Sequence, residues 1–340
     1  MKKIFSILII TILLGVSCKD ASTSVKFITD EAKQSVEVFV NDIYFTSFIY
    51  PDNMEKQTLY PIQTPSGKFI TRGFPLNPRP FERTDHPHHV GLWFNFGDVN
   101  GLDFWNNSYS IKPEDKHKYG SILFEKIVEA NNKKGRLVIL SNWVDNNKNI
   151  LLSEKTTYVF GGLKNDIRTI ERISELTAKQ KVTFTENKEG LLGLRLDRAF
   201  EEPTKKAEAF LDANGNVTET PVLNNDGVNG IYRNAEGLTG GDVWGKRSKW
   251  VALKTNKEGE IITIVILDNK NNLNYPAWSH ARGYGLFATN NLAGQAVDKN
   301  AESVKFELAP AETITFKHKV IIGGDLTDAE INNFSNNFNK

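Results

Sequence analysis

The chain has 340 residues, with 42 lysines and arginines against 41 aspartates and glutamates and a formal net charge of +1 at pH 7. So balanced a charge provides no strong positive field, and we expect no nucleic-acid partner. A single cysteine excludes an internal disulfide bond, and a hydrophobic content of 39% is enough for a sizeable core.

The first 18 residues have the pattern of an export signal. Two lysines precede an apolar run at residues 4–16, which ends shortly before Cys18. The run is too short for a comfortable membrane span. We therefore expect a lipoprotein signal over residues 1–17, with Cys18 as the lipidated new N-terminus and plain secretion as the alternative. A lipid on Cys18 would tether the protein to the outer or inner membrane, in the periplasm or at the cell surface.

Alternating apolar and polar residues predict a series of β-strands. The predicted strands are residues 36–40, 43–48, 135–144, 151–160, 166–176, 261–267, 304–309 and 313–322. Asn41 and Asp42 predict a turn between the first two strands. Because short polar turns separate successive strands, we expect a mainly β fold with a large antiparallel β-sandwich.

One short helix is expected near the end of the chain. Thr327 and Glu330 have the spacing of a capping box, and Ile331 and Phe334 follow at helical spacing. Residues 201–229 are charged and rich in Asn and Gly, so we expect a long excursion from the sheet there. With no linker and no internal repeat, residues 22–340 are predicted to form a single catalytic domain.

The segment DHPHHVGLWFNFGDVNGLDFW, residues 85–105, is the most informative part of the chain. It contains half of the six histidines within four residues, followed by two aspartates among several aromatic residues. Imidazoles and carboxylates transfer protons, and aromatic rings stack on sugar faces. The segment therefore predicts a carbohydrate site. The alternative is a histidine-rich turn between two core strands.

Three later segments carry similar groups. Residues 237–250 and 274–294 combine glycines with aromatic and basic residues, and the weaker segment 187–198 carries Glu189, Arg195 and Arg198. Arginine is informative here because its planar fork binds a carboxylate at two points. The predicted catalytic candidates are His86, His88, His89, His280 and Tyr284. The predicted substrate-binding residues are Trp93, Asp98, Asn100, Asp103, Trp105, Glu189, Arg195, Trp244, Arg247 and Arg282.

The DHPHH…GDVNGLDFW, VWGKRSKW and WSHARGYGLFA segments together resemble a family of unknown function that is labelled after the PmoA subunit of methane oxygenase. The resemblance covers most of the chain after the signal. It implies a secreted or periplasmic protein of polysaccharide-degrading bacteria, with a fold similar to the β-supersandwich of galactose mutarotases and several polysaccharide lyases. It does not imply oxygenase chemistry, because that subunit is an integral membrane protein and this chain has no apolar spanning segment after residue 17.

Four functions fit these residues. A lyase or dehydratase would use histidine and tyrosine for proton transfer and arginine to bind a carboxylate. A glycoside hydrolase would need two carboxylates, for which Asp98, Asp103 and Glu189 are candidates. A mutarotase or epimerase would need one acid and one base, such as His88 and Glu189. A protein that only binds oligosaccharide would need the aromatic residues alone.

Of these functions, the sequence favours β-elimination on an oligosaccharide that contains a uronic acid. Histidines and arginines occur together, which suits an acidic sugar, and no pair of carboxylates stands out as a hydrolase would require. A metal is the remaining question. His86 and His88 could alternate along a strand and meet His280, but Pro87 disturbs strand geometry. We therefore expect no metal and no other cofactor.

The lipid anchor gives the first testable prediction. Changing Cys18 to Ala removes the thiol that would carry the lipid, so the variant is expected to leave the membrane fraction. Fractionation followed by immunoblotting measures this, with a serine-to-alanine change at Ser24 as the control that stays membrane-bound. A Cys18→Ala protein that remains in the membrane fraction would contradict the anchor.

Overall fold

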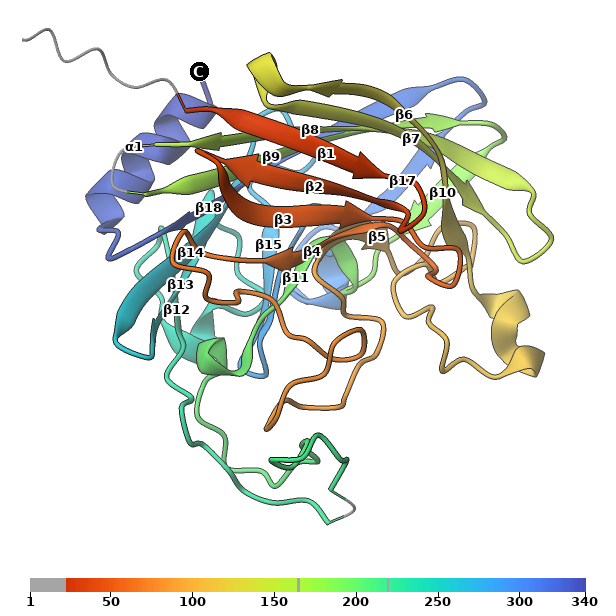
Figure 1. Ribbon diagram of the computed structural model, residues 1–340. Coiled ribbons are helices and arrows are strands. Elements are labelled where there is room, and N and C mark those ends of the chain that lie inside the picture. The colour runs from red at the N-terminus through yellow and green to blue at the C-terminus, as the bar shows by residue number, and fades with distance from the viewer. Residues whose placement is uncertain (1–22, 164–165, 219) are drawn as a thin grey trace, which may run out of the picture.

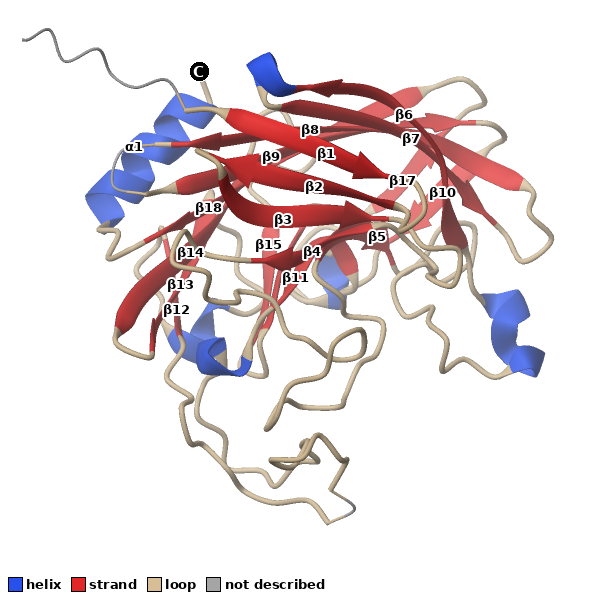
Figure 2. Ribbon diagram, in the orientation of Figure 1, coloured by secondary structure: helices blue, strands red, loops and turns tan. Residues whose placement is uncertain are grey.

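The regular structure consists mostly of β-strands (Figures 1 and 2). A computed structural model describes residues 23–163, 166–218 and 220–340. The predicted signal and Cys18 lie outside the described residues. No helix in these three ranges is long and apolar enough to cross a membrane.

Two eight-stranded antiparallel sheets form the two layers of the fold. The first sheet has the order β1-β2-β3-β4-β5-β11-β16-β15. Its strands are β1 (Val25–Asp30), β2 (Ser35–Val40), β3 (Ile43–Ile49), β4 (Thr58–Ile62), β5 (Leu92–Phe96), β11 (Gly190–Arg195), β15 (Trp278–Arg282) and β16 (Leu286–Asn290).

The second sheet has the order β12-β13-β14-β18-β9-β8-β7-β6, and β10 pairs with β17 in a separate ribbon. The strands of the second sheet are β6 (Ser121–Asn131), β7 (Arg136–Val144), β8 (Ile150–Gly162), β9 (Arg168–Ala178), β12 (Ile231–Asn234), β13 (Trp250–Lys257), β14 (Glu260–Asp268) and β18 (Thr313–Gly323). The ribbon strands are β10 (Val182–Thr185) and β17 (Lys305–Leu308). Short 3-10 turns lie at η1 (Pro113–Lys118), η2 (Asn132–Lys134), η3 (Arg198–Phe200), η4 (Gly240–Val243) and η5 (Gly294–Ala296).

The predicted fold class is confirmed, and so is each predicted strand. The predicted ranges correspond to β2, β3, β7, β8, β9, β14, β17 and β18, with ends that differ by at most two residues. Asn41 and Asp42 have φ values of 53° and 61°, which is the left-handed conformation that a two-residue hairpin turn requires. Local alternation and turn chemistry were therefore sufficient to place these strands.

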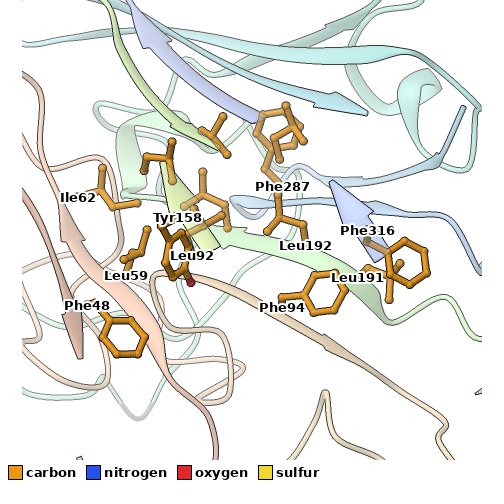
Figure 3. Packing of buried hydrophobic residues seen from close by; sticks show 14 of the residues in the cluster. Phe48, Leu59, Ile62, Leu92, Phe94, Tyr158, Leu191, Leu192, Phe287 and Phe316 are labelled. Carbon is orange, nitrogen blue, oxygen red and sulfur yellow. The ribbon is translucent and has the colours of Figure 1, made fainter. Parts of the chain in front are cut away.

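The core lies between the two sheets, and one hydrophobic cluster contains residues of both (Figure 3). Leu92 and Phe94 of β5 point into it, and the Phe94 ring centre lies 6.0 Å from that of Phe316 on β18. Arg172 is also buried there, where it donates to Glu154 at 2.7 Å and to the hydroxyl of Tyr158. Because side chains alternate along a strand, the neighbours of Leu92 and Phe94 must face away from this core.

The C-terminal helix α1 (Asp328–Phe338) covers the outer face of the second sheet. Its capping box is present, because the Thr327 hydroxyl accepts from the backbone N–H of Glu330 and the Glu330 carboxylate accepts from the backbone N–H of Thr327. Ile331 and Phe338 pack against Trp250 and its neighbours on β13 and β14. The predicted helix is therefore confirmed together with its start.

Residues 201–229 form a long loop below the sheets in Figure 1, and no strand element lies within their described part. Phe210 is buried and attaches the loop, with the guanidinium carbons of Arg83 and Arg198 at 5.4 and 4.6 Å from its ring centre. Arg83 also donates to Glu201 at 2.7 Å. These contacts hold the loop beside residues 79–83.

The core gives a stability prediction. Phe94→Ala is expected to lower the free energy of unfolding by about 3–5 kcal/mol, because Phe94 is buried between the sheets and its removal leaves a cavity. Urea denaturation measures this. Val128→Ala on the exposed part of β6 is the control and should change the free energy of unfolding by no more than about 0.5 kcal/mol. A loss below about 1 kcal/mol for Phe94→Ala would contradict the packing.

Candidate functional site

Four neighbouring strands of the first sheet place Trp93, Gly193, Ala288 and His280 in one row. The register pairs Trp93 of β5 with Gly193 of β11, Gly193 with Ala288 of β16, and Ala288 with His280 of β15. Directly paired residues point to the same face of a sheet. This row therefore lies on the face opposite the core, and we call it the outer face of the first sheet.

The small residues in the row make room for two indole rings. A Cβ on Gly193 would lie 2.5 Å from a ring carbon of Trp93 and 2.9 Å from a ring carbon of Trp105. Both tryptophans are fully buried, and their ring centres are 5.1 Å apart. Neither indole is exposed to solvent in this structure, and the substrate-binding role of Trp93 and Trp105 stays a prediction. They form the floor on which the histidines rest.

Residues 85–90, which we call the histidine loop, precede β5. The backbone N–H of His89 donates to the carbonyl of His86 at 3.0 Å, and His86 has a φ of 46°. His86 and His88 thus lie in a turn and do not alternate along a strand, so the strand arrangement considered for a metal is wrong. In the described part of the chain, no group of three or more His, Cys, Asp and Glu side chains is placed to hold a metal ion.

The histidine loop and the floor build a stack of four rings. The order is Tyr284, His86, His89 and Trp93, with successive ring centres 5.0, 4.9 and 5.3 Å apart and interplanar angles of 4°, 2° and 21°. Tyr284 comes from the hairpin between β15 and β16, so the stack joins distant parts of the chain. Flat rings at these separations stabilise one another and hold the imidazoles in fixed orientations.

Asp85 holds the histidine loop against two buried arginines. One oxygen of Asp85 accepts from Arg72 at 2.8 Å and from Arg195 at 2.6 Å. Arg72 also donates to the carbonyls of His86 and His89 at 2.9 and 3.3 Å. Burial alone would raise the pKa of Asp85, but Arg195, His86 and Arg72 outweigh it and hold the pKa well below its usual range. Asp85 is therefore ionised, and Arg195 is committed to it.

His86 is the accessible histidine of the loop. Its side chain is 40% exposed, and its Nδ1 lies 2.9 Å from the other carboxylate oxygen of Asp85. The contact lacks the alignment of a good hydrogen bond, so its effect is mainly electrostatic. A carboxylate beside Nδ1 favours a proton on that nitrogen, which leaves Nε2 of the neutral ring as the proton acceptor.

His89, by contrast, is buried within the stack. Trp105 donates from its indole nitrogen to Nε2 at 3.2 Å, and the Arg195 guanidinium lies 3.4 Å from Nδ1. Donors face both ring nitrogens, and burial lowers the pKa of His89 well below its ordinary value. His89 is therefore a neutral structural ring that supports His86.

His280 is also neutral, and its hydrogen-bond partner determines which ring nitrogen carries the proton. Its Nδ1 lies 2.7 Å from the backbone carbonyl of Lys188, which can only accept, so Nδ1 carries the proton and Nε2 does not. Nε2 lies 4.0 Å from the carboxylate of Glu189. Burial lowers the pKa of His280 to about 4, although the bond to Lys188 opposes this. Only 4% of the side chain is exposed, which limits contact with a ligand.

His86, Tyr284 and Arg282 form the reachable part of the site, which we call the exposed edge. Arg282 is exposed at the end of β15, its guanidinium carbon lies 5.3 Å from the centre of a Trp244 ring, and it has no salt bridge within the described residues. Burial raises the pKa of Tyr284, so its phenol keeps its proton at neutral pH. A phenol, a proton acceptor and a cation thus meet on this edge, where the Arg282 guanidinium interacts with the Tyr284 side chain.

Other candidates have structural roles. Asp98 accepts a hydrogen bond from the backbone N–H of Gly101. Asn100 donates to the backbone carbonyl of Lys181 and accepts from the backbone N–H of Thr183, at the start of β10. Asp103 accepts two backbone N–H groups and one amide, from Trp105 and Asn106. These three polar residues thus form hydrogen bonds within turns and between neighbouring segments, and their substrate-binding role stays a prediction.

Arg247 lies apart from the stack. It donates to the carbonyls of residues 274–276 and packs its guanidinium 4.7 Å from the ring centre of Trp278. It lines a different hollow with Asp298 and Glu302. Arg247 was predicted to bind substrate, and in this structure it lines a hollow that none of the three loop histidines lines.

The sequence reasoning missed three charged residues at the site, namely Lys56, Arg72 and Asp85. Lys56 is buried, and its ammonium lies 5.5 Å from the centre of the Trp93 ring. Lys56 and Arg72 occur in segments without glycine or tryptophan clusters, so no local pattern marked them. Asp85 begins the histidine motif, and that adjacency was the signal that could have identified it.

Residues 35–336 match a family of unknown function, DUF6807. The chain belongs to this family. The description of this family does not include the methane-oxygenase label. None of the curated proteins matches the sequence.

Several solved structures are similar to the chain at low identity. The Slr1438 protein from Synechocystis sp. PCC 6803 is 10% identical with a TM-score of 0.32, over 88% of this chain and 96% of that chain. A galactose mutarotase related enzyme from Lactobacillus acidophilus is 9% identical with a TM-score of 0.31, over 88% and 97%. Heparan sulfate lyase HepC from Pedobacter heparinus is 11% identical with a TM-score of 0.31, over 90% and 36%. At these values no residue role is transferred from them.

The pairing of Asp85 gives a prediction with a defined pH dependence. Asp85→Asn is expected to lower the free energy of unfolding by about 3 kcal/mol at pH 7, because two buried guanidinium groups lose their carboxylate. The pKa of Asp85 is lower in the folded than in the unfolded chain. Its stabilisation is therefore complete above a pH of about 4 and is lost as the pH falls below that value.

Urea titrations of both proteins at pH 7 and pH 3 measure this effect. The difference in unfolding free energy between wild type and Asp85→Asn should shrink at pH 3. Asp42→Asn, in an exposed hairpin turn, is the matched control and should behave as wild type at both pH values. Equal stability of wild type and Asp85→Asn at pH 7 would refute the role of this ion pair.

Proposed function

We propose that the protein is a carbohydrate-active enzyme that abstracts a proton and eliminates across a carbon–oxygen bond of a uronate-containing oligosaccharide, as a lyase or dehydratase. The observation that carries the proposal is the exposed edge, where His86, Tyr284 and Arg282 combine a proton acceptor, a proton donor and a cation that forms no salt bridge with the described residues. This set matches the three requirements of β-elimination beside a carboxylate.

In the proposed reaction, Nε2 of His86 takes the proton from the carbon that bears the uronate carboxylate. The electron pair of that C–H bond forms a carbon–carbon double bond, and the bond from the neighbouring carbon to the leaving oxygen breaks. Tyr284 donates its phenolic proton to that oxygen. A water then returns a proton to Tyr284, and His86 releases its proton to solvent.

Arg282 would bind the carboxylate of the sugar. Its guanidinium is exposed and can form the two-point contact that a carboxylate accepts. Negative charge grows on the carboxylate as the proton leaves, so a cation there stabilises the transition state more than the ground state. Asp85 keeps His86 in the accepting tautomer and favours the imidazolium that forms.

The competing functions are less well supported by the site. Hydrolysis needs two available carboxylates. Of the three candidates, Asp103 is engaged by the backbone of its turn, Asp98 accepts from Gly101, and Glu189 pairs with Lys188 beside His280. Epimerisation would use the same acid and base but would leave no double bond. We further propose that the enzyme acts outside the cytoplasm, tethered through Cys18, where polysaccharide fragments are available.

The reaction is tested with a panel of uronate oligosaccharides, by ultraviolet absorbance and product mass. An unsaturated product with chain cleavage marks a lyase, and loss of water without cleavage marks a dehydratase. Gain of water with cleavage, inversion of a centre without a double bond, or binding without change would each overturn the elimination.

Variants of the exposed edge test the assigned roles. His86→Ala and Tyr284→Phe should each lower kcat by at least about 10²-fold, the usual scale for a general base or acid. Arg282→Met should lower both kcat and kcat/KM for uronates. His117→Ala, an exposed histidine on η1, is the matched control and should retain full activity. Activity within about threefold of wild type for His86→Ala would remove His86 from the mechanism.

A further inference from the structure

A cavity of about 350 Å³ lies beside the histidine loop, where His88 lines it and has its ring centre 5.6 Å from that of His86. Residues 53–56, 74–76, 87, 88, 90 and 107–109 contribute its walls, and Lys56 and His88 are among them. His86, Tyr284 and Arg282 are not part of its lining. Its volume lies within the range of sites that hold small molecules.

Lys56 brings a buried positive charge to this cavity. The side chain is 5% exposed, and its ammonium donates to the backbone carbonyl of His88 at 2.7 Å. No carboxylate of the described residues lies within ion-pair distance of it. A buried cation without a counter-charge is costly, so a bound anion would stabilise it.

The acids nearest to Lys56 are already occupied. Glu55 accepts from Lys116 at 2.6 Å and from the hydroxyl of Ser121, so its charge is balanced. Asp103 is engaged by the backbone of the turn that follows it. Lys56 is therefore the charged group at this end of the cavity that has no ion-pair partner among the described residues.

His88 supplies a second polar group to the same corner. Its Nε2 is buried and has no hydrogen-bond partner. Burial, reinforced by the charge of Lys56, lowers the pKa of His88 to about 2, so the ring is neutral and has one N–H to donate. An anion that receives a hydrogen bond from His88 would satisfy this nitrogen as well as the ammonium.

The rest of the lining is mixed. Met54, Phe74, Pro75, Leu76, Pro87 and Val90 are apolar, and Asn53, Glu55, Asn107, Ser108 and Tyr109 complete the walls. The apolar residues favour a ligand with an apolar body, because contact with them removes apolar surface from water. The polar corner and the apolar wall together define the two ends of a ligand.

We infer that this cavity is a second binding site, distinct from the exposed edge, for a small organic acid with one carboxylate and an apolar ring or chain. The carboxylate is placed at Lys56 and His88, and the apolar body lies against Phe74 and Leu76. The inference does not depend on the elimination reaction, since none of the groups assigned to that reaction lines the cavity.

Ligand-observed NMR titrations of the full chain test this site, with benzoate as the probe. Benzyl alcohol keeps the ring and removes the charge, and glucuronate keeps the carboxylate and replaces the apolar ring by a sugar. Benzoate is expected to bind at least about tenfold more tightly than either, because it alone matches both ends of the cavity. Equal binding of benzoate and benzyl alcohol, or tighter binding of glucuronate, would overturn the inference.

Two variants place the binding in this cavity. Lys56→Met keeps the chain length and removes the charge, and it should weaken benzoate binding at least about tenfold. Leu76→Asp adds a negative charge at a partly exposed wall position, 42% exposed, and should weaken it similarly without disturbing the core. Leu223→Asp in an exposed loop is the matched control and should bind as wild type. Unchanged benzoate affinity in Leu76→Asp, with the fold intact, would also refute the site.

Discussion

The carboxylate of Asp85 lies between the buried guanidinium groups of Arg72 and Arg195, and the geometry of the histidine loop depends on this contact. Arg195 extends from β11 in the sheet, whereas Asp85 belongs to the loop, so the ion pair fastens one to the other. Arg72 adds bonds to the carbonyls of His86 and His89, which fixes the turn itself. Because both guanidinium groups are buried and Asp85 is their shared carboxylate partner, removing that carboxylate would leave two buried cations without it.

This attachment gives the three neighbouring histidines different environments. His89 is pressed onto Trp93 and Trp105 and becomes a neutral support. His86 stacks on its outer side against Tyr284 and remains partly exposed, with Asp85 at its Nδ1. His88 turns towards the cavity that Lys56 also lines. The three histidines of this loop therefore have different roles. His89 supports the stack, His86 is the candidate base, and His88 lines the cavity.

The floor under the stack depends on residue size. Gly193 has no Cβ, and its position under Trp93 and Trp105 admits both indoles where any larger residue would collide with them. Ala288 continues the row towards His280. The same register that sends Leu92 and Phe94 into the core therefore sends Trp93 to the outer face, so the core and the site arise from one alternation along β5.

The sequence by itself determined the mainly β fold, eight strands, the hairpin turn at Asn41 and Asp42, and the start of helix α1. These features depend on neighbours in the chain, namely side-chain alternation, turn conformation and a capping box. The sequence also indicated the histidine motif and the segments of Arg195, His280 and Tyr284, because unusual residue types gather there. It did so without showing their partners.

Tertiary structure decided which of those residues share a site. Strand order places β5, β11, β16 and β15 side by side, and this pairing of distant segments joins Trp93 to His280. The same fold buries Trp93 and Trp105 and engages Asp98 and Asp103 in turns. It also directs the Arg247 guanidinium to the backbone carbonyls of residues 274–276. Lys56 and Arg72 carry no local signature, since their importance comes only from burial beside groups far away in the chain. Burial and hydrogen-bond partners depend on the whole fold, so a linear pattern cannot specify them.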